Sequence, residues 1–282
     1  MAHTTAYHYD AEVCGSYGQL HLQPRPAAAQ RCQRTEVMIE PAPDDYRERS
    51  DFFGNRTSYF EIRAPHRSLF VSSTSWIEVE VGARQAAVDA LRSSGRPWEA
   101  ARAEDLEFVL DSRLVSASDA LAAYGAESFR PGRPVVEAVE ELTSRIYHDF
   151  AFRPGATRVT TTAEEVLANR EGVCQDFAHL AIGCLRSLGL SARYVSGYLE
   201  TIPPPGKARI QGADVSHAWA SLGVAGHGWV DFDPTNNQLV NDRYVVTAWG
   251  RDYADVPPLM GIIFTEGTKH DLEVLVDVVR ED

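Results

Sequence analysis

The sequence has few of the features that mark metal, disulfide-rich or membrane proteins. Its 282 residues contain only four cysteines, no two of them spaced as Cys-x-x-Cys, and the nine histidines include no His-Glu-x-x-His. So few cysteines in a chain of this length argue against a disulfide framework and a structural zinc site. No apolar run approaches the roughly 18 residues that a membrane-spanning helix needs. We therefore expect no metal, no cofactor and no membrane partner.

Positive charge is scarce as well. The chain has 27 basic and 40 acidic residues, a net charge of −13, which argues against a broad nucleic-acid-binding surface. Residues 1–5 show no basic stretch followed by an apolar one, so no secretory signal is predicted and we expect a cytoplasmic protein. The composition, 44% hydrophobic and 24% charged, is that of an ordinary soluble globular protein.

The chain divides into three stretches. Residues 1–82 are predicted to form a β-sandwich-like domain, because short β-type runs alternate there with turn signals. Residues 83–132 are rich in Ala, Arg and Glu and predict a helical connector. Residues 133–282 contain the remaining helices, strands and motifs, and the whole chain is expected to be of the α+β class. The predicted strands of the first stretch are 18–22, 35–39, 58–62, 68–71 and 76–81.

Cys174 stands where a glycine-containing break meets the start of a predicted helix. Apolar residues recur from Phe177 to Leu188 at helical spacing, and Gly189 ends the helix. The free N–H groups and the dipole at such a helix start stabilise a thiolate. Most cysteines are simply small buried hydrophobes, and Cys184, which points away from Cys174 on the same helix, is interpreted in that way.

His217 and Asp233 lie on two predicted strands, 216–224 and 229–233, joined by a turn around Gly226. If Leu222 faces Gly228, His217 faces Asp233, and both side chains lie on one face of the hairpin. A base and its orienting carboxylate would then be neighbours, as nucleophilic catalysis by a cysteine requires. Asp231 has the same parity, so the spacing alone leaves it open as the acid.

Four segments resemble the bacterial transglutaminase-like family. Residues 171–180 (EGVCQDFAHL) are similar to its nucleophile segment and 188–198 (LGLSARYVSGY) to the segment that follows. Residues 216–220 (SHAWA) and 228–236 (GWVDFDPTN) resemble its histidine and aspartate segments. By this resemblance Cys174 is the nucleophile, His217 the base and Asp233 the orienting acid.

Other fragments extend the resemblance over most of the chain. Residues 51–55 (DFFGN) and 64–66 (APH) are similar to the β-rich N-terminal domain that often precedes this core, and 250–258 (GRDYADVPP) to a segment after the triad. The family implies a papain-like core in which the cysteine helix packs on an antiparallel sheet. Its animal members use calcium, but no loop here has the alternating acidic ligands that calcium prefers.

The resemblance also implies chemistry on a peptide or protein amide through a thioester acyl-enzyme. Hydrolysis by a peptidase or amidase is the favoured hypothesis. Transfer of the acyl group to an amine, or a non-catalytic binding module on the same fold, remain alternatives. The backbone N–H of Cys174 is expected to be one hydrogen-bond donor to the oxyanion. The second donor is not predicted, because the position of Gln175 directly after the nucleophile does not direct its side chain toward the oxyanion.

Three further residues are candidate substrate contacts: Trp219, His179 and Tyr253. Trp219 flanks His217, His179 lies on the cysteine helix, and Tyr253 belongs to the segment that resembles the family after the triad. Packing in the core, or in an ordinary polar loop for Tyr253, is the alternative for each. Residues 200–214, rich in proline, are a candidate lid, with a plain surface loop as the alternative.

Overall fold

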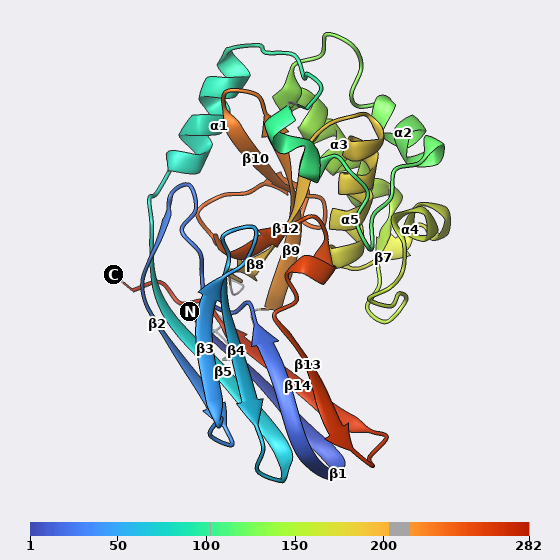
Figure 1. The fold of residues 1–282 in the computed structure, drawn as a ribbon. Helices are drawn as coiled ribbons and strands as arrows, with labels where there is room; N and C mark the ends of the chain where they lie inside the picture. Colours follow the sequence, from blue (N-terminus) through green and yellow to red (C-terminus); the bar gives the residue numbers. More distant parts are fainter. Residues whose placement is uncertain (102, 203–214, 282) are drawn as a thin grey trace.

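The computed structural model describes residues 1–101, 103–202 and 215–281. Figure 1 shows a strand-rich lower part and a mixed helical and stranded upper part, with the two chain ends on the same side. The first part is the β-sandwich that the sequence predicted. Its strands are β1 (Ala2–Leu20), β2 (Gln30–Glu40), β3 (Asp45–Ser50), β4 (Arg56–Ile62), β5 (His66–Val79), β13 (Leu259–Thr265) and β14 (His270–Asp277).

Strand β1 belongs to both rows of the sandwich. Its first half pairs with β5 and β14, and its second half pairs with β4 and β13. The two rows are therefore β2–β5–β1–β14 and β3–β4–β1–β13, both antiparallel. Apolar side chains from both rows form one buried cluster, which includes Leu20, Phe60 and Val71. Burial of this shared cluster is what holds the two rows together.

Strands β13 and β14 correct the predicted division of the chain. The sequence placed residues 133–282 in the core, whereas these two strands pair with β1 and complete the sandwich. A local pattern predicts that a segment is extended but carries no information about a partner strand at the other end of the chain. The predicted connector, 83–132, contributes α1 (Ala83–Ser93), a short 3-10 helix (Ala103–Phe108) and α2 (Asp119–Ala126).

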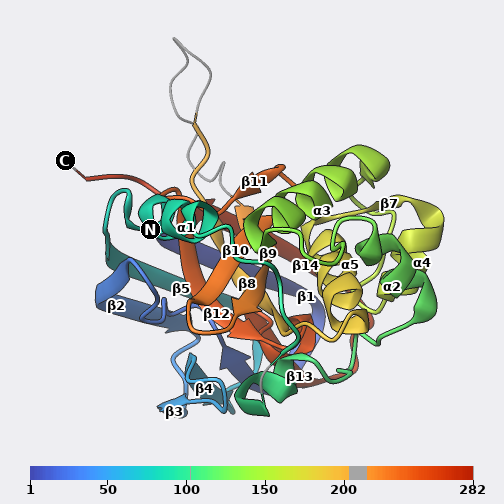
Figure 2. The same cartoon turned by 90° about the horizontal axis from the view of Figure 1, so that it is seen from above.

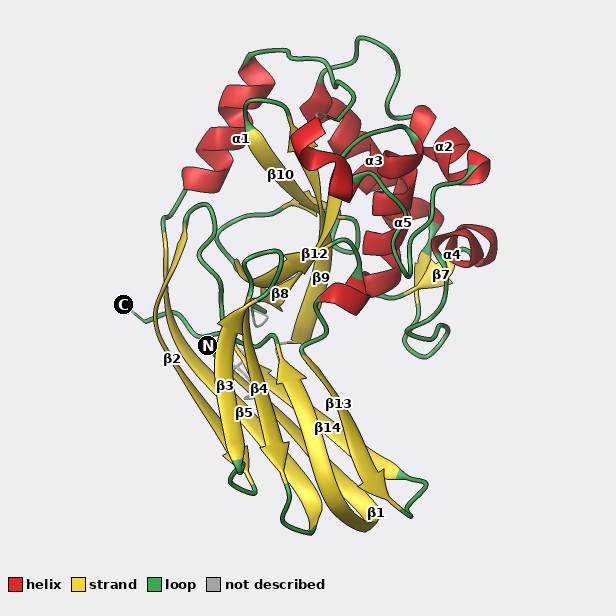
Figure 3. Cartoon of the chain, viewed as in Figure 1, coloured by secondary structure: helices red, strands yellow, loops and turns green. Residues whose placement is uncertain are grey.

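The core is a five-stranded antiparallel sheet with helices on one face, as Figure 3 shows. The strand order is β11–β10–β9–β8–β12, from Gln238–Leu239, Gly228–Asp233, Val215–Val224, Ala192–Leu199 and Tyr244–Gly250. Helix α5 (Cys174–Ser187) packs on β8 and β9, and α2 and α4 (Ala163–Asn169) pack on α5. Helix α3 (Val135–Asp149) and the short strands β6 (Ala151–Phe152) and β7 (Glu171–Gly172) complete this layer. Figure 2, seen from above, shows α2, α3, α4 and α5 gathered on one side of the sheet, with α1 apart from them.

The sandwich docks on β12, the edge strand of the core sheet. The side-chain amide of Gln30 donates to the carbonyl of Val246 and accepts its N–H, both at 2.8 Å. Asn55 makes the same pair of bonds with Trp249, at 2.8 and 2.9 Å. Both amides are buried, so two side chains replace the missing neighbour strand and leave the outward backbone groups of β12 satisfied.

Replacing Gln30 should therefore weaken the whole fold. In Gln30→Ala, two buried backbone groups of Val246 lose their partners, which we expect to lower the free energy of unfolding by about 2–4 kcal/mol. Gln33→Ala is the matched control, because Gln33 lies on the same strand but bonds only to Glu78 at the surface. Urea unfolding measures both variants, and equal stability of the two would contradict the docking role of Gln30.

Candidate active site

Cys174 is the first residue of α5 and is half-buried. The turn before it is fixed by Asp176, whose carboxylate accepts the N–H of Val173 at 2.8 Å and the hydroxyl of Thr157 at 2.6 Å. Gly172 is needed because a Cβ there would lie 2.8 Å from the Cβ of Asp176. Asp176 thus caps the helix, and the sulfur of Cys174 sits at the positive end of the helix dipole.

The hairpin of β9 and β10 brings His217 and Asp233 to one face, with a register that differs from the predicted one. Leu222 faces Val230 rather than Gly228, and the turn is shortened to three residues around Gly226. Gly226 and Gly228 both have positive φ, 76° and 80°, which permits this tight turn. The register shifts by two residues, so the parity is unchanged and the shared face is preserved.

His217 and Asp233 form a short, buried contact. The ring Nε2 lies 2.6 Å from Oδ2 of Asp233, and the two residues are 7% and 0% exposed. Because Nε2 is engaged by the carboxylate, Nδ1 is the ring nitrogen left for the thiol. Cys174 is within hydrogen-bonding reach of His217, and this bond contributes to the ring's pKa. The three side chains predicted from the sequence therefore meet at one place.

The Asp233 carboxylate is surrounded by donors. Oδ1 accepts the N–H of Thr235 at 2.8 Å, and Oδ2 accepts the side-chain amide of Asn236 and the hydroxyl of Tyr244, each at 2.7 Å. Gln238 in turn donates to the Tyr244 oxygen at 2.6 Å. Sequence reasoning missed these supporting residues. Asn236 had a local signal, three residues after Asp233, but Tyr244 arrives on another strand, to which no motif points.

The surroundings shift the pKa of both partners. Burial by itself disfavours the charged ring of His217, but the hydrogen bonds and charges of Asp233 and Cys174 outweigh it and raise the pKa to about 10. Burial likewise acts to raise the pKa of Asp233, yet its bonds to His217, Asn236 and Tyr244 hold that pKa below its usual value. The pair is thus an imidazolium beside a carboxylate over the neutral pH range.

Asp231, the alternative acid, lies elsewhere. Its Oδ1 is 4.0 Å from a guanidinium nitrogen of Arg193, a side chain that stacks over Trp229 and Trp249. Asp233 is therefore the carboxylate that contacts His217.

Of the three predicted substrate contacts, two are buried and one is partly exposed. Trp219 is completely buried with its ring 5.2 Å from that of Tyr244, and His179 is completely buried with Nε2 accepting the N–H of Tyr253 at 3.1 Å. Burial also lowers the pKa of His179 to about 4. Neither side chain reaches solvent, so both belong to the packing beneath the site and the predicted substrate contact is corrected. Only Tyr253 of the three is partly exposed.

Three other expectations concern groups around the site. Cys184 is buried in the core, as expected, and its burial raises the pKa of the thiol to about 12. Among the described residues no three His, Cys, Asp or Glu side chains gather in a way that could hold a metal ion. Most of the predicted lid, 200–214, lies outside the described residues.

Known proteins resemble the chain in both parts. Residues 1–78 match the family described as the bacterial transglutaminase-like N-terminal region, and residues 122–234 match the transglutaminase-like superfamily. The chain belongs to the transglutaminase-like superfamily.

Its relatives include uncharacterized proteins of Mycobacterium tuberculosis and Mycobacterium leprae. They are 48% and 33% identical to this transglutaminase-like protein, over 99% of its chain in each case and over 91% and 98% of their own. A solved structure of a proposed cysteine protease from Cytophaga hutchinsonii shares the fold with a TM-score of 0.72. That comparison covers 100% of this chain and 93% of the other at 22% identity.

No helix in the described part of the chain is long and apolar enough to cross a membrane.

The His217–Asp233 pair should make stability depend on pH. The pKa of His217 is raised from 6.5 to about 10 in the folded protein. The stability that the His217–Asp233 pair provides is therefore complete below pH 6.5, the pKa of the unfolded state, and is lost as the pH rises through the folded-state pKa. The free energy of unfolding of the wild type, relative to that of His217→Gln, should therefore fall by about 4 kcal/mol between about pH 6 and pH 10. Urea unfolding at both pH values measures it, with His227→Gln in the exposed turn as control. A pH-independent difference would contradict the raised pKa.

Proposed function

We propose that the protein is a cysteine-dependent amide hydrolase, a peptidase or amidase, in which Cys174 is the nucleophile. The observation that carries this proposal is the buried His217–Asp233 pair at 2.6 Å, placed beside a half-buried cysteine at a helix N-terminus. A base that is oriented by a carboxylate and faces a thiol is the arrangement that nucleophilic catalysis needs. Superfamily membership supports the same chemistry.

The first half of the reaction acylates the enzyme. The cycle starts from the thiolate of Cys174 beside the imidazolium of His217, and the thiolate attacks the carbonyl carbon of the amide. The C–N bond breaks as the imidazolium of His217 gives its proton to the leaving amine, which leaves a thioester on the sulfur. Asp233 keeps the ring in place and stabilises its positive charge throughout.

The second half releases the acid. His217 takes a proton from a water molecule, whose oxygen attacks the thioester carbonyl, and the C–S bond breaks to return the sulfur of Cys174. The backbone N–H of Cys174, at the start of α5, is the proposed donor to the oxyanion in both halves. The Gln175 amide donates to the carbonyl of Val159 at 3.2 Å, so it is held toward that loop.

Acyl transfer to an amine is the second candidate, because the same thioester can be attacked by an amine and the chain belongs to a transglutaminase-like superfamily. Water is the acceptor at the highest concentration around a partly exposed sulfur, which favours hydrolysis. We also propose the cytoplasm as the location, since all four cysteines are free and such thiols persist in reducing compartments.

Activity measurements on a library of short peptides should separate these roles. Cys174→Ala and His217→Ala should each lower turnover by at least ~10³-fold, while Asp233→Ala should retain a measurable remainder, since it orients rather than reacts. Adding a primary amine tests transfer, because an amine-linked product would show the acyltransferase. Wild-type rates in Cys174→Ala would contradict the proposed nucleophile, and no turnover of any peptide by the wild type would favour a binding role without catalysis.

A further inference from the structure

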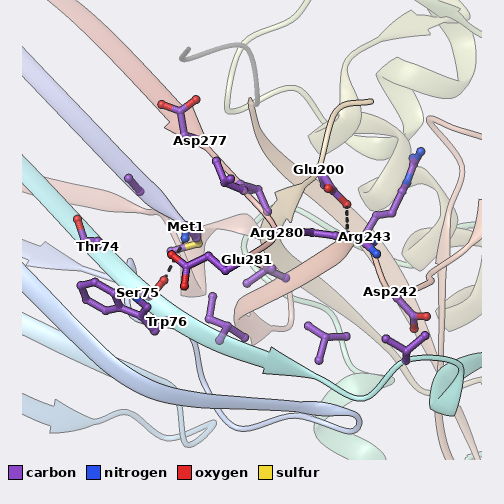
Figure 4. Close-up of a pocket in the computed structure, with 17 residues that line it drawn as sticks. Met1, Thr74, Ser75, Trp76, Glu200, Asp242, Arg243, Asp277, Arg280 and Glu281 are labelled. Atoms are coloured by element: carbon purple, nitrogen blue, oxygen red, sulfur yellow. Dashed lines mark hydrogen bonds and ion pairs between the residues drawn. The ribbon is translucent and has the colours of Figure 1, made fainter. Parts of the chain in front are cut away.

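Strand β12 separates a cavity from the candidate active site. The cavity, of about 690 Å³, is lined at the start of this strand by Arg243 and Val245, and Figure 4 shows Arg243 at its wall. Side chains alternate along a strand, so Tyr244 faces the opposite side. There its ring is completely buried, 6.1 Å from the ring of His217. Tyr244 therefore borders the candidate active site rather than the cavity.

The hydroxyl of Tyr244 and the ring of His217 share one oxygen. Oδ2 of Asp233 accepts the Tyr244 hydroxyl at 2.7 Å and lies 2.6 Å from Nε2 of His217, and the side-chain amide of Asn236 is a third donor to it. Tyr244 and Asp233 are each 0% exposed. A hydrogen bond to an ionised carboxylate is strong where no water competes for the oxygen. The phenol and the imidazole therefore compete for the negative charge of the same atom.

The direction of the Tyr244 hydroxyl follows from its partners. The side-chain amide of Gln238, on β11, donates to the Tyr244 oxygen at 2.6 Å, and a carboxylate only accepts. The single hydroxyl hydrogen therefore points to Asp233. Burial, and after it the charge of Asp233, raises the pKa of Tyr244 above its ordinary value, although Arg243 acts to lower it. The phenol thus keeps this hydrogen while His217 titrates.

The groups that act directly on the His217 ring come from two elements. They are Asp233 on β10 and Cys174 on α5. On β8, the residue opposite His217 is Gly197, which has no side chain. Tyr244 acts on the ring through Asp233, so its hydroxyl can change the proton affinity of His217 without a bond to it.

The proton on His217 has two tasks in the proposed reaction. It must stay on the ring while the thiolate of Cys174 attacks, and it must then pass to the leaving amine. A general acid that holds its proton more tightly transfers it more slowly. The Tyr244 bond stabilises the negative charge on Oδ2 of Asp233, so less of that charge is available to hold the proton of His217. Loss of this bond should therefore strengthen the hold of Asp233 on the imidazolium.

We propose that Tyr244 is a positioning residue whose hydroxyl, supported by Gln238, shares the Asp233 oxygen with His217 and so weakens the hold of Asp233 on the proton of His217. The effect on turnover rests on the proposed hydrolysis, because that reaction passes the proton to a leaving amine. The effect on the His217 proton does not rest on it, since that effect is measured without a substrate.

NMR titration of the full chain with isotope-labelled histidine rings tests the proposal. The resonance of His217 is identified by its loss in His217→Gln. Tyr244→Phe removes only the hydroxyl group and should raise the pKa of His217 above the wild-type value by about 0.5–1 pH unit, the equivalent of one neutral hydrogen bond. Gln238→Leu should raise it by less, because the phenol remains but donates more weakly without the amide behind it.

Tyr198→Phe is the matched control. Tyr198 is also a buried tyrosine, on the neighbouring strand β8, but its hydroxyl bonds Nδ1 of His3 at 2.9 Å. The pKa of His217 should therefore stay at the wild-type value in Tyr198→Phe. If Tyr244 served only to pack the site, Tyr244→Phe would loosen the His217–Asp233 contact and lower the pKa of His217. A His217 pKa in Tyr244→Phe that equals or falls below the wild-type value would overturn the proposal.

Two further readouts keep the outcomes apart. Thermal unfolding checks that each variant folds, and if Tyr244→Phe does not, Gln238→Leu decides in its place because it acts on the same hydroxyl and leaves the ring intact. On a peptide that the wild type turns over, Tyr244→Phe should lower kcat about 3–10-fold and leave KM unchanged, and an unchanged kcat would overturn the role in turnover. A wild type that turns over no peptide would remove the proposed hydrolysis, and the NMR titration would still decide the role of the hydroxyl.

Discussion

The contact between His217 and Asp233 is the interaction on which the rest of the site depends. A charged pair that is 7% and 0% exposed is costly to bury unless its remaining lone pairs are satisfied. Here the backbone N–H of Thr235, the amide of Asn236 and the hydroxyl of Tyr244 satisfy them. The imidazole is thereby fixed in orientation and keeps one nitrogen free for the thiol of Cys174.

The β-sandwich supports this pair from a distance. Tyr244 begins β12, and two residues later Val246 is held by the side-chain amide of Gln30 from the sandwich. Strands from the two ends of the chain pair in that sandwich, β1 with β13 and β14. The N-terminal part therefore completes the edge of the core sheet that carries one of the donors to Asp233, which is a physical reason for the two parts to occur in one chain.

The sequence predicted what local patterns encode. Helical spacing after Cys174 and strand parity at His217 and Asp233 placed these residues correctly relative to their elements, and a shift of two residues in register kept the shared face. The donor role of Tyr244 could not be predicted, because it depends on the order of strands in the sheet. The predicted substrate role of Trp219 and His179 was wrong, because both side chains are completely buried. That burial depends on packing between distant segments, which a local sequence pattern does not reveal. The pairing of β13 and β14 with β1 is likewise a long-range property.

The rate of Cys174 alkylation by iodoacetamide against pH, read by mass spectrometry, tests the central claim most directly. A thiolate that is paired with the imidazolium of His217 should be labelled rapidly well below pH 8, and His217→Ala should lose that fast labelling. The labelling rate of Asp233→Asn should lie between those of the wild type and His217→Ala. In that variant the His217 ring keeps a hydrogen-bonding neighbour but loses the negative charge that stabilises it as an imidazolium. Slow labelling in the wild type that matches the His217→Ala variant at every pH would contradict the account.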